Sequence, residues 1–331
     1  MLQLLRKIAF PFSLIYAIVV HVRNFLFDKG VFTSISYETP TLCIGNLSVG
    51  GTGKTPMIEY LVRLLHEHRV AVLSRGYKRK SKGFLLAGSQ SSVEDLGDEP
   101  FQLHKKFSKV TVAVDADRRN GISKLEELVS PDIILLDDAF QHRRVKPRSS
   151  ILLTAYTNLF VDDWYLPTGD LRDSKREAKR ANIIVVTKCP KALSIGEKQM
   201  ISEKLKQSSH QKILFSSLKY GANLSSCNGS LEFSELEGKN IALVTGIASP
   251  MPLVNHLKQI GIQFKHFDYA DHHYFTKQEI EKLKGFDIVL TTEKDYVRLD
   301  GQLPKLFYLE VAHHFNENDH LVLEQVVNGL V

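Results

Sequence analysis

The chain has 331 residues, enough for two ordinary domains, and its 43% hydrophobic and 24% charged residues form no repeat or low-complexity tract, which is typical of a globular protein. Its formal net charge of +6 favours anionic partners, whether a nucleotide, a phospholipid headgroup or a nucleic acid. Three widely separated cysteines without CxxC spacing exclude a disulfide framework and a zinc site, and they indicate a reducing cytosol: Cys43, Cys189 and Cys227.

The N-terminal segment is apolar and is flanked by basic residues. Fifteen residues without a formal charge, IAFPFSLIYAIVVHV, lie between Lys7 and Arg23. This run is shorter than the roughly 18 apolar residues that indicate a membrane span, and no small-x-small signal-peptide cleavage site follows it. We therefore expect an interfacial helix over 1–30, with aromatic side chains near the acyl boundary and basic side chains at the headgroups. A buried core helix is the alternative.

Short apolar runs alternate with helix-compatible stretches along the rest of the chain. We predict a helix at 54–68 and strands at 40–46, 70–74, 110–114, 132–138, 150–156, 182–188, 240–246 and 287–293. Continuous apolar strands that alternate with helices indicate an α/β fold, with a mainly parallel sheet covered on both faces. Polar segments around 205–235 interrupt this pattern. We predict two α/β lobes, a P-loop nucleotide-binding domain over 31–150 and a second domain over 151–331, with a boundary between about 145 and 180.

The stretch GNLSVGGTGKTP, at 45–56, lies between a predicted strand and a predicted helix. Backbone N–H groups of such a turn, together with the helix N-terminus, bind phosphates. The usual pattern G-x-x-x-x-G-K-[ST] has glycine where this chain has Ser48, so a glycine-rich turn without a ligand is the alternative. We predict that Lys54 binds the β- and γ-phosphates and that the Thr55 hydroxyl binds Mg²⁺. The predicted nucleotide-binding residues are Ser48, Val49, Gly50, Gly51, Thr52, Gly53, Lys54 and Thr55.

The stretch IILLDDAFQH, at 133–142, is an apolar strand that ends in two aspartates, Asp137 and Asp138. This is the form of a Walker B element, whose carboxylate reaches Mg²⁺ directly or through water. An aspartate that only caps the following turn is the alternative, but the pairing with the phosphate loop favours the metal. ATP is favoured over GTP, because VTKCP at 186–190 and TTEKD at 291–295 do not match the guanine motif [NT]-K-x-D.

Three further stretches are less specific on their own: LGDEP at 96–100, LPTGDLRDSKREAKRA at 166–181 and YADHHYFT at 269–276. The first places two carboxylates in a turn, and the third packs an aspartate against two histidines. Solvated loops or helix caps explain each of them equally well when it is taken alone.

Taken together, these stretches resemble the tetraacyldisaccharide 4'-kinase family of lipid A biosynthesis. The resemblance covers nearly the whole chain in the family's order and spacing, and it includes GNLSVGGTGKTP, SRGYKRKSKG, GDEP, DDAFQH, LPTGDLRD, DHH and TTEKD. The family's own loop has serine at the place of Ser48. Two departures stand out. Ala139 replaces a frequent glycine, which matters only if a positive φ is needed there, and Asp173 replaces a glutamate.

The resemblance implies a P-loop NTPase-like enzyme of two α/β lobes, bound through its N-terminal helix to the cytoplasmic face of the inner membrane. It implies transfer of the γ-phosphate of MgATP to the 4'-hydroxyl of a tetraacylated glucosamine disaccharide 1-phosphate. The expected cofactors are therefore ATP and Mg²⁺, and the expected partners are the acylated disaccharide and an anionic membrane surface. We expect no nucleic acid and no obligate protein partner.

The resemblance also implies roles for individual residues. Asp98 is the expected general base and His272 its partner, and with Lys54 and Asp138 they form the expected catalytic set. Thr55 with Asp137 or Asp138 is expected to hold Mg²⁺. Charge on the nucleotide or the lipid phosphate would be neutralised by Arg75, Arg118, His142 and Arg172, with Gln141 helping to position them. Asp173 is expected at the same phosphate or substrate site. For the arginines, surface salt bridges are the alternative.

Two other functional classes share a phosphate loop. A membrane-associated NTPase switch or maturation factor would carry switch or dimer-sensing elements, which we do not find in the sequence. A soluble ATP-dependent ligase is disfavoured by the apolar N-terminus.

Overall fold

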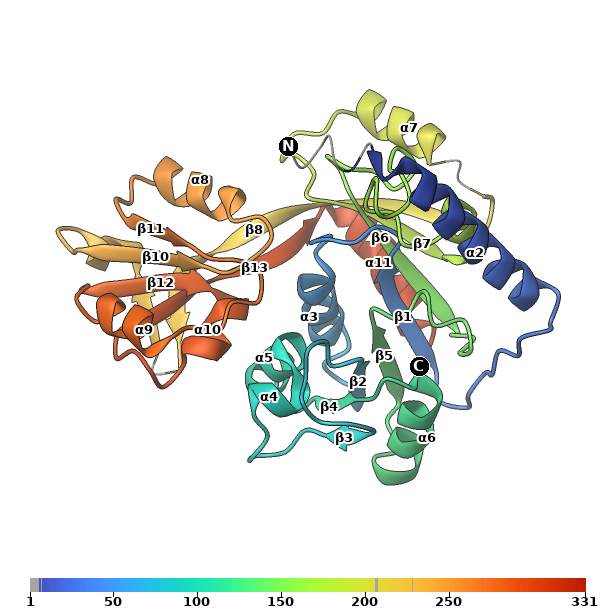
Figure 1. Cartoon of the computed structure of the whole chain (residues 1–331), viewed down its shortest axis with the longest axis horizontal. Coiled ribbons are helices and arrows are strands. Elements are labelled where there is room, and N and C mark those ends of the chain that lie inside the picture. Colours follow the sequence, from blue (N-terminus) through green and yellow to red (C-terminus); the bar gives the residue numbers. More distant parts are fainter. Residues whose placement is uncertain (1–5, 7, 206–207, 228) are drawn as a thin grey trace.

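The computed structural model describes residues 6, 8–205, 208–227 and 229–331. Two lobes lie side by side and share one continuous sheet (Figure 1). The strands follow the order β11-β10-β12-β13-β8-β7-β6-β1-β5-β2-β4-β3, and β9 pairs with β8 outside this path. Most neighbouring strands are parallel, so the predicted α/β fold with a mainly parallel sheet is confirmed.

The first lobe contains the phosphate-loop sheet. Its parallel strands are β1 (Thr41–Asn46), β2 (Val70–Ser74), β4 (Thr111–Val114), β5 (Ile133–Asp137), β6 (Ser149–Ala155) and β7 (Ile183–Thr187). The short strand β3 (Leu85–Leu86) pairs antiparallel with β4 at the edge. These parallel strands are almost entirely buried, because helices or loops cover both faces of the sheet.

Each face of this sheet has its own hydrophobic core. On one face, α3 (Lys54–Leu64) and the C-terminal helix α11 (Glu317–Asn328) pack on β1 and β5, as Met57 and Leu323 illustrate. On the other face, Ile122 of α6 (Arg118–Leu128) and Leu205 after α7 (Ile195–Lys204) pack with the segment 159–181, which includes the 3₁₀ helix η1 (Lys175–Arg180). The helices α4 (Val93–Leu96) and α5 (Asp98–Lys106) lie on the side that faces the second lobe.

The second lobe is a smaller α/β unit. Its strands β10 (Ile241–Thr245), β11 (Lys265–Asp268) and β12 (Ile288–Thr292) are parallel, and β9 (Gly229–Glu232) forms a hairpin with β8. Its helices are α8 (Met251–Gln259), α9 (Lys277–Leu283), α10 (Glu293–Leu299) and the 3₁₀ helix η2 (Phe233–Leu236). Two buried clusters, one on each face, hold this lobe together.

Two long strands connect the lobes. β8 (Lys212–Ser226) begins beside β7 and continues into the second lobe, where it pairs antiparallel with β13 (Leu306–Phe315). The range 205–235, where polar residues interrupt the apolar pattern of the sequence, contains β8 and β9. Much of this ribbon is only partly buried, so its strands carry many polar residues instead of a continuous apolar run.

The expected domain boundary at residue 150 falls inside β6, which pairs with β1 and β7 in the middle of the first lobe. The helix α11 also returns to the first lobe, where Val327 is fully buried. We therefore propose that the lobes divide within β8 and again within β13, and that 151–331 is not a single domain.

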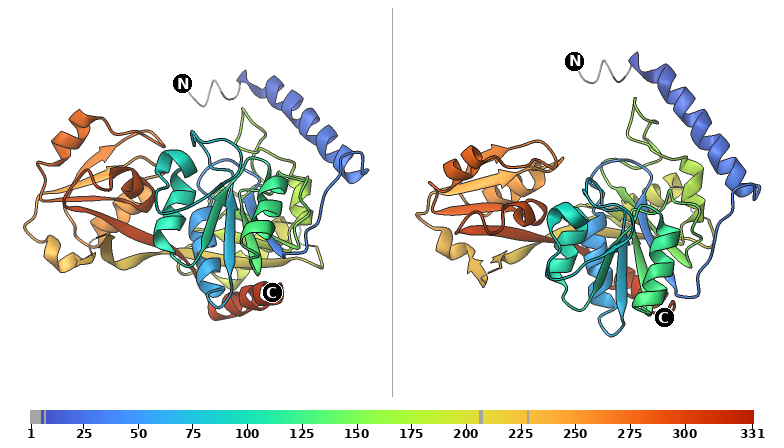
Figure 2. Two further views of the ribbon diagram at one scale, coloured as in Figure 1. Left: turned by 90° about the horizontal axis from the view of Figure 1, so that it is seen from below. Right: turned by 60° about the horizontal axis from the view of Figure 1, so that its bottom comes forward.

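The helix α2 (Phe10–Asp28) lies on the outside of the first lobe, apart from the sheet (Figure 2). Within the described part of the chain, it is the one helix that is long and apolar enough to cross a membrane. An 18-residue stretch of it has a mean hydropathy of 1.5, and 17% of this stretch is buried.

Candidate active site

The phosphate loop joins β1 to α3, as predicted. Gly50 and Gly53 have φ angles of +110° and +86°, which side chains with a Cβ rarely adopt. The loop is also held from the segment 164–173, because the Val49 N–H donates to the Asp170 carbonyl at 2.7 Å. Ser48 is buried beside Leu171, and its hydroxyl has no hydrogen-bond partner within the described residues.

Two residues from distant strands bind carbonyls of the loop. The Thr187 hydroxyl, at the end of β7, donates to the Thr52 carbonyl at 2.9 Å. His313 Nε2, from β13, lies 2.9 Å from the Gly53 carbonyl, and its Nδ1 lies 2.8 Å from the Ser216 hydroxyl. Because a carbonyl only accepts, Nε2 carries the proton and Nδ1 accepts from the serine. Burial lowers the pKa of His313 to about 4, so the ring is neutral at physiological pH.

Asp137, the last residue of β5, and Asp138, which follows it, have different surroundings. Asp137 is buried and accepts a hydrogen bond from the Ser74 hydroxyl at 2.8 Å; burial, followed by the charges of Glu99 and Asp138, raises its pKa to about 7. Asp138 has a positive φ of 48°, and both of its carboxylate oxygens accept hydrogen bonds from Arg172. Burial opposes its ionisation, but Arg172 and Lys54 outweigh burial and lower its pKa to about 2.

Asn46, the last residue of β1, connects the loop with these aspartates. Its amide nitrogen donates to the Thr52 hydroxyl at 2.9 Å, and its amide oxygen accepts from Lys54 at 3.4 Å and from Arg172. Gln141 donates to the backbone carbonyl of Asn46 at 2.8 Å. Lys54 Nζ lies 3.7 Å from Asp138, so the loop lysine, the second aspartate and Arg172 form one charged cluster.

The remaining basic residues lie around Arg118. Its guanidinium is buried and donates to the backbone carbonyls of Asp115 and Asp137 at 3.0 and 3.1 Å. Burial, together with the charge of Arg75, lowers the pKa of Arg118 against the opposite effect of the aspartates. Arg75 itself is exposed. His142 is half-buried, and burial followed by the charge of Arg118 lowers its pKa.

Asp98 begins α5, and its partners come from the second lobe. His272 Nδ1 lies 2.6 Å from its Oδ2. Arg298, on α10, donates from Nε to Oδ1 at 2.9 Å and from Nη2 to Oδ2. Burial raises the pKa of Asp98, but the hydrogen bonds from Arg298 and His272 outweigh it and hold this pKa far below its usual range.

Asp98 and its two partners lie next to the phosphate-loop cluster. Glu99 follows Asp98 and is close enough to Asp137 to raise its pKa. The Glu99 carboxylate lies 4.0 Å from Lys294 Nζ, which contacts His272 Nε2 at 3.1 Å. A cavity of about 550 Å³ between the lobes is lined by Thr55 and Lys188 on one side and by Glu293 and Lys294 on the other. Asp98 and His272 thus meet where the two lobes face each other, next to the cluster of Lys54 and Asp138.

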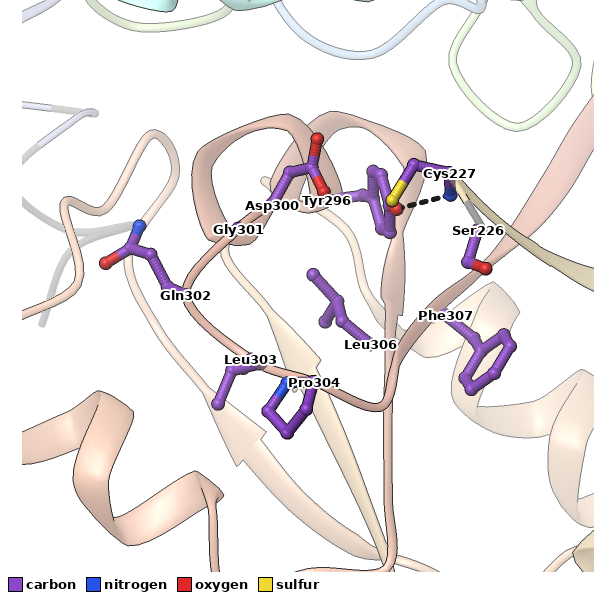
Figure 3. Close-up of a pocket in the computed structure, with 10 residues that line it drawn as sticks. All are labelled: Ser226, Cys227, Tyr296, Asp300, Gly301, Gln302, Leu303, Pro304, Leu306 and Phe307. Carbon is purple, nitrogen blue, oxygen red and sulfur yellow. Dashed lines mark hydrogen bonds between the residues drawn. The ribbon is translucent and has the colours of Figure 1, made fainter. Parts of the chain in front are cut away.

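A second cavity, of about 380 Å³, lies within the second lobe between Cys227 and the segment 296–307 (Figure 3). Among the described residues that line it, none belongs to the predicted site.

Comparisons with known proteins identify the family. A model of the tetraacyldisaccharide-1-P 4'-kinase family, LpxK, matches residues 5–328. The tetraacyldisaccharide 4'-kinase of Flavobacterium johnsoniae is 50% identical over 95% of this chain and 94% of that protein. The protein of the same name from Bacteroides thetaiotaomicron is 46% identical over 89% of this chain and 83% of its own length. The chain belongs to the tetraacyldisaccharide 4'-kinase family.

A solved structure agrees with this result. LpxK from Aquifex aeolicus, crystallised in complex with ATP, is similar with a TM-score of 0.81 at 31% identity, and the match covers 98% of this chain and 99% of that one. The resemblance inferred from the sequence motifs is therefore confirmed, and with it the expectation of a kinase with a phosphate-loop fold.

One predicted site residue lies elsewhere. Asp173 is fully buried beneath α2, where it accepts hydrogen bonds from Asn24 and Arg23, both at 2.8 Å. Its side chain therefore binds the N-terminal helix, although the neighbouring Arg172 reaches the aspartates. Ala139 is not among the described residues with a positive φ, so the replaced glycine is not needed there.

Sequence reasoning missed Arg298, Thr187 and His313. Arg298 lies three positions after Asp295, the last residue of TTEKD, which is about one helical turn. A helix predicted over that motif would have placed Arg298 on the same face as Asp295, and so would have indicated a buried basic side chain. Thr187 lies near the end of the predicted strand 182–188, but its residue type gives no sign that it contacts the phosphate loop. For His313 no local signal exists, because its role depends on the path of β13 between the lobes.

Proposed function

We propose that this chain transfers the γ-phosphate of MgATP to the 4'-hydroxyl of a tetraacyldisaccharide 1-phosphate. One observation supports this proposal most directly. A buried carboxylate, Asp98, lies near a complete phosphate loop and is held in one orientation by two residues of the other lobe. A phosphoryl transfer requires a phosphate site, a positioned acceptor hydroxyl and a group that takes its proton.

Asp98 is the proposed proton acceptor. Arg298 and His272 keep its pKa far below the usual range, so it is ionised at neutral pH but is a weak base. A weak base suffices when the transition state is loose, because the hydroxyl then loses its proton late and positioning contributes most of the catalysis. The hydrogen bonds from Arg298 and His272 prevent rotation of the carboxylate, so its oxygens stay in place for the substrate hydroxyl.

Asp137 and Thr55 are the proposed Mg²⁺ ligands. Kinases hold Mg²⁺ through one or two carboxylates, with phosphate oxygens and waters completing the octahedron. Asp137 is a buried carboxylate whose charge is disfavoured by its surroundings, which a divalent cation would stabilise. Arg172 binds both oxygens of Asp138, so we propose that Asp138 orients Arg172 and Lys54. When bound, Mg²⁺ would neutralise charge on the phosphates.

Lys54, Arg172 and Arg118 are the proposed cationic groups that face the phosphates. Lys54 and Arg172 share Asn46 and Asp138 as partners, so their positions depend on each other. Arg118 supports the backbone at Asp137, and Arg75 lies on the exposed side of this group. For Gln141 we propose a supporting role, since it binds the carbonyl of Asn46.

The polarity of α2 supports an interfacial position at the membrane. Its buried residues include the polar Ser13 and Asn24, whereas Phe12, Ile15 and Ile18 are exposed. This is the reverse of a helix on a water-soluble surface, and it places apolar side chains where an acyl layer would accept them. We propose that the enzyme binds the cytoplasmic face of the inner membrane through this helix, where its lipid substrate would be available.

An assay with γ-labelled ATP and an extracted acylated disaccharide 1-phosphate tests the proposal. Transfer of label to the lipid is the expected result. ATP hydrolysis that does not depend on the lipid, with no labelled lipid, would contradict it and would favour the NTPase switch.

A further inference from the structure

Asp173 lies between the membrane-facing helix and the phosphate-binding cluster. Its Oδ1 accepts from Asn24 Nδ2 and from the Ser174 N–H, both at 2.8 Å, and its Oδ2 accepts from Arg23 Nη2 at 2.8 Å. The side chain has no exposed surface. A buried carboxylate requires such partners, because an unpaired buried charge is strongly destabilising.

The adjacent residue belongs to the active site. Arg172 Nη1 donates to Asp138 Oδ2 at 2.9 Å, and its Nη2 donates to Asn46. The Arg172 backbone is held from both sides, because its N–H donates to the Leu47 carbonyl at 2.8 Å and its carbonyl accepts from the Tyr16 hydroxyl of α2 at 3.0 Å. The chain at 172 is therefore fixed between the start of the phosphate loop and α2.

The contact surface of α2 includes several polar contacts beside the buried Val20. Ser13 donates to Thr168 at 2.8 Å, and Arg143 of the first lobe donates to the Asn24 carbonyl at 3.0 Å. Apolar packing would anchor a helix at least as well as a buried ionic network, since buried ion pairs are seldom more stabilising than hydrophobic contacts. What a hydrogen-bonded network adds is a defined geometry, and here it defines the position of residues 172 and 173.

We infer that Asp173 is a positioning residue that couples the docking of α2 to the geometry of Arg172, and thereby to Asp138 and the phosphate loop. The N-terminal helix is then a structural part of the nucleotide site as well as a membrane contact. The inference rests on the proposed function for its catalytic consequence, but its effect on MgATP binding is measurable without any lipid.

The test compares two variants of the network, Asn24→Ala and Asp173→Asn, with a matched control. Arg6→Ala removes a contact of the same N-terminal segment to the same loop, the Arg6–Asp170 ion pair at 2.8 Å, which is half-exposed and does not touch Asp173. Measurements are MgATP affinity by titration calorimetry, kcat with substrate in detergent micelles, and binding to vesicles of phosphatidylethanolamine and phosphatidylglycerol.

We expect MgATP affinity and kcat to fall about tenfold in both network variants, because a small displacement of a charged group is enough for such a loss. In Arg6→Ala both quantities should stay close to wild type. Asp173→Glu, which keeps the charge, should recover part of both losses, whereas a purely structural role would lower the melting temperature alone. Vesicle binding should be unchanged in the folded variants, because the outer face of α2 is intact.

Network variants that bind MgATP and turn over like wild type would overturn the inference, as would a loss confined to vesicle binding. If Asp173→Asn does not fold, Tyr16→Phe replaces it, since it removes one hydroxyl from a half-buried position and should weaken MgATP binding in the same direction. A wild-type protein that binds MgATP but does not label the lipid would contradict the proposed function and leave the binding comparison valid.

Discussion

At the scale of single residues, the surroundings of Asp98 decide what it does. The carboxylate is buried, which alone would favour its neutral form, yet a bidentate arginine and a histidine hold it ionised. Its side chain is therefore fixed in charge and in direction. These are the two properties that a proton acceptor for a sugar hydroxyl needs in a site that works mainly by positioning.

Replacement of Asp98 by alanine should remove most turnover and leave nucleotide affinity nearly unchanged, because the carboxylate is not part of the phosphate loop. Single-turnover kinetics and ATP titration would measure the two effects. Glu94→Gln is a matched control, since Glu94 is an exposed carboxylate that pairs with Lys80 shortly before the same turn. Turnover close to wild type in Asp98→Ala would refute its assignment as the base.

Replacement of Arg298 by methionine should raise the pKa of Asp98, because the strongest partner of the carboxylate is lost. Activity requires ionised Asp98, so the acid limb of the pH–rate profile should move to higher pH. Removing one partner of a buried ion pair should also lower the free energy of unfolding by about 3–5 kcal/mol, although His272 still contacts Asp98. An acid limb at the wild-type position in the folded variant would argue against a link between Arg298 and the reacting carboxylate.

At the scale of elements, one buried lysine joins helices and strands of both lobes. Lys106 of α5 donates to Glu59 of α3 at 2.7 Å and to Glu293 of α10 at 2.5 Å, and Glu310 of β13 lies 3.7 Å away. Arg63 also lies 3.6 Å from Glu59 and 3.8 Å from Glu310, so three carboxylates share two cations and a net negative charge remains. Burial, followed by the charge of Glu59, therefore raises the pKa of Glu293 to about 7.

This pKa predicts how stability changes with pH. The ordinary pKa of a glutamate is 4.5, so between about pH 4.5 and 7 the folded protein binds more protons at Glu293 than the unfolded chain, and stability falls as pH rises through that range. Glu293→Gln should remove this loss, which is on the order of 1–3 kcal/mol. Melting temperatures at pH 5 and pH 8 would measure it, with Glu281→Gln as control, because Glu281 is an exposed carboxylate on α9 that pairs with Lys284 outside this cluster. The same pH slope in Glu293→Gln and wild type would exclude the site as its source.

At the scale of the whole molecule, α2 and the second lobe lie on different sides of the first lobe (Figures 1 and 2). Exposed aromatic side chains extend the apolar face of α2 onto the neighbouring loop, where Phe10 meets Trp164 edge-to-face with ring centroids 5.7 Å apart; Trp164 is itself exposed. The exposed apolar face of α2 thus extends over Trp164, on the same lobe as the phosphate loop.

Removal of apolar side chains from the outer face of α2 should weaken membrane binding without loss of the site. The double substitution Ile15→Ser and Ile18→Ser leaves the contacts of Asp173 intact and should lower vesicle partitioning at least about tenfold, given the transfer free energy of two isoleucines. Deletion of 1–27 is less informative, because it also removes Arg23 and Asn24.

Ile195→Ser on α7 is the control, because Ile195 is a highly exposed apolar residue elsewhere on the first lobe. Sedimentation with vesicles is the measurement. Full sedimentation of the double variant would count against the interfacial position of α2.

Sequence patterns predicted those parts of this protein that are written in contiguous residues. The parallel strands of the first lobe are buried on both faces, so each is an apolar run, and six of the predicted runs correspond to β1, β2, β4, β5, β6 and β7. The phosphate loop and the paired aspartates are equally local, because a turn between a strand and a helix sets their backbone geometry. With GDEP and DHH they suffice to recognise the family.

The tertiary structure decided the features that join distant segments. Arg298 and Asp98 are 200 positions apart, and His313 and Gly53 are 260 apart, so no local periodicity links them. The path of β8 and β13 was hidden because a partly exposed ribbon lacks the apolar run of a buried strand. Asp173 could be read as a site residue from its motif, but burial and hydrogen bonding turn its side chain to α2. Residue types and spacing thus determined the chemistry that is present, whereas chain packing decided which groups meet.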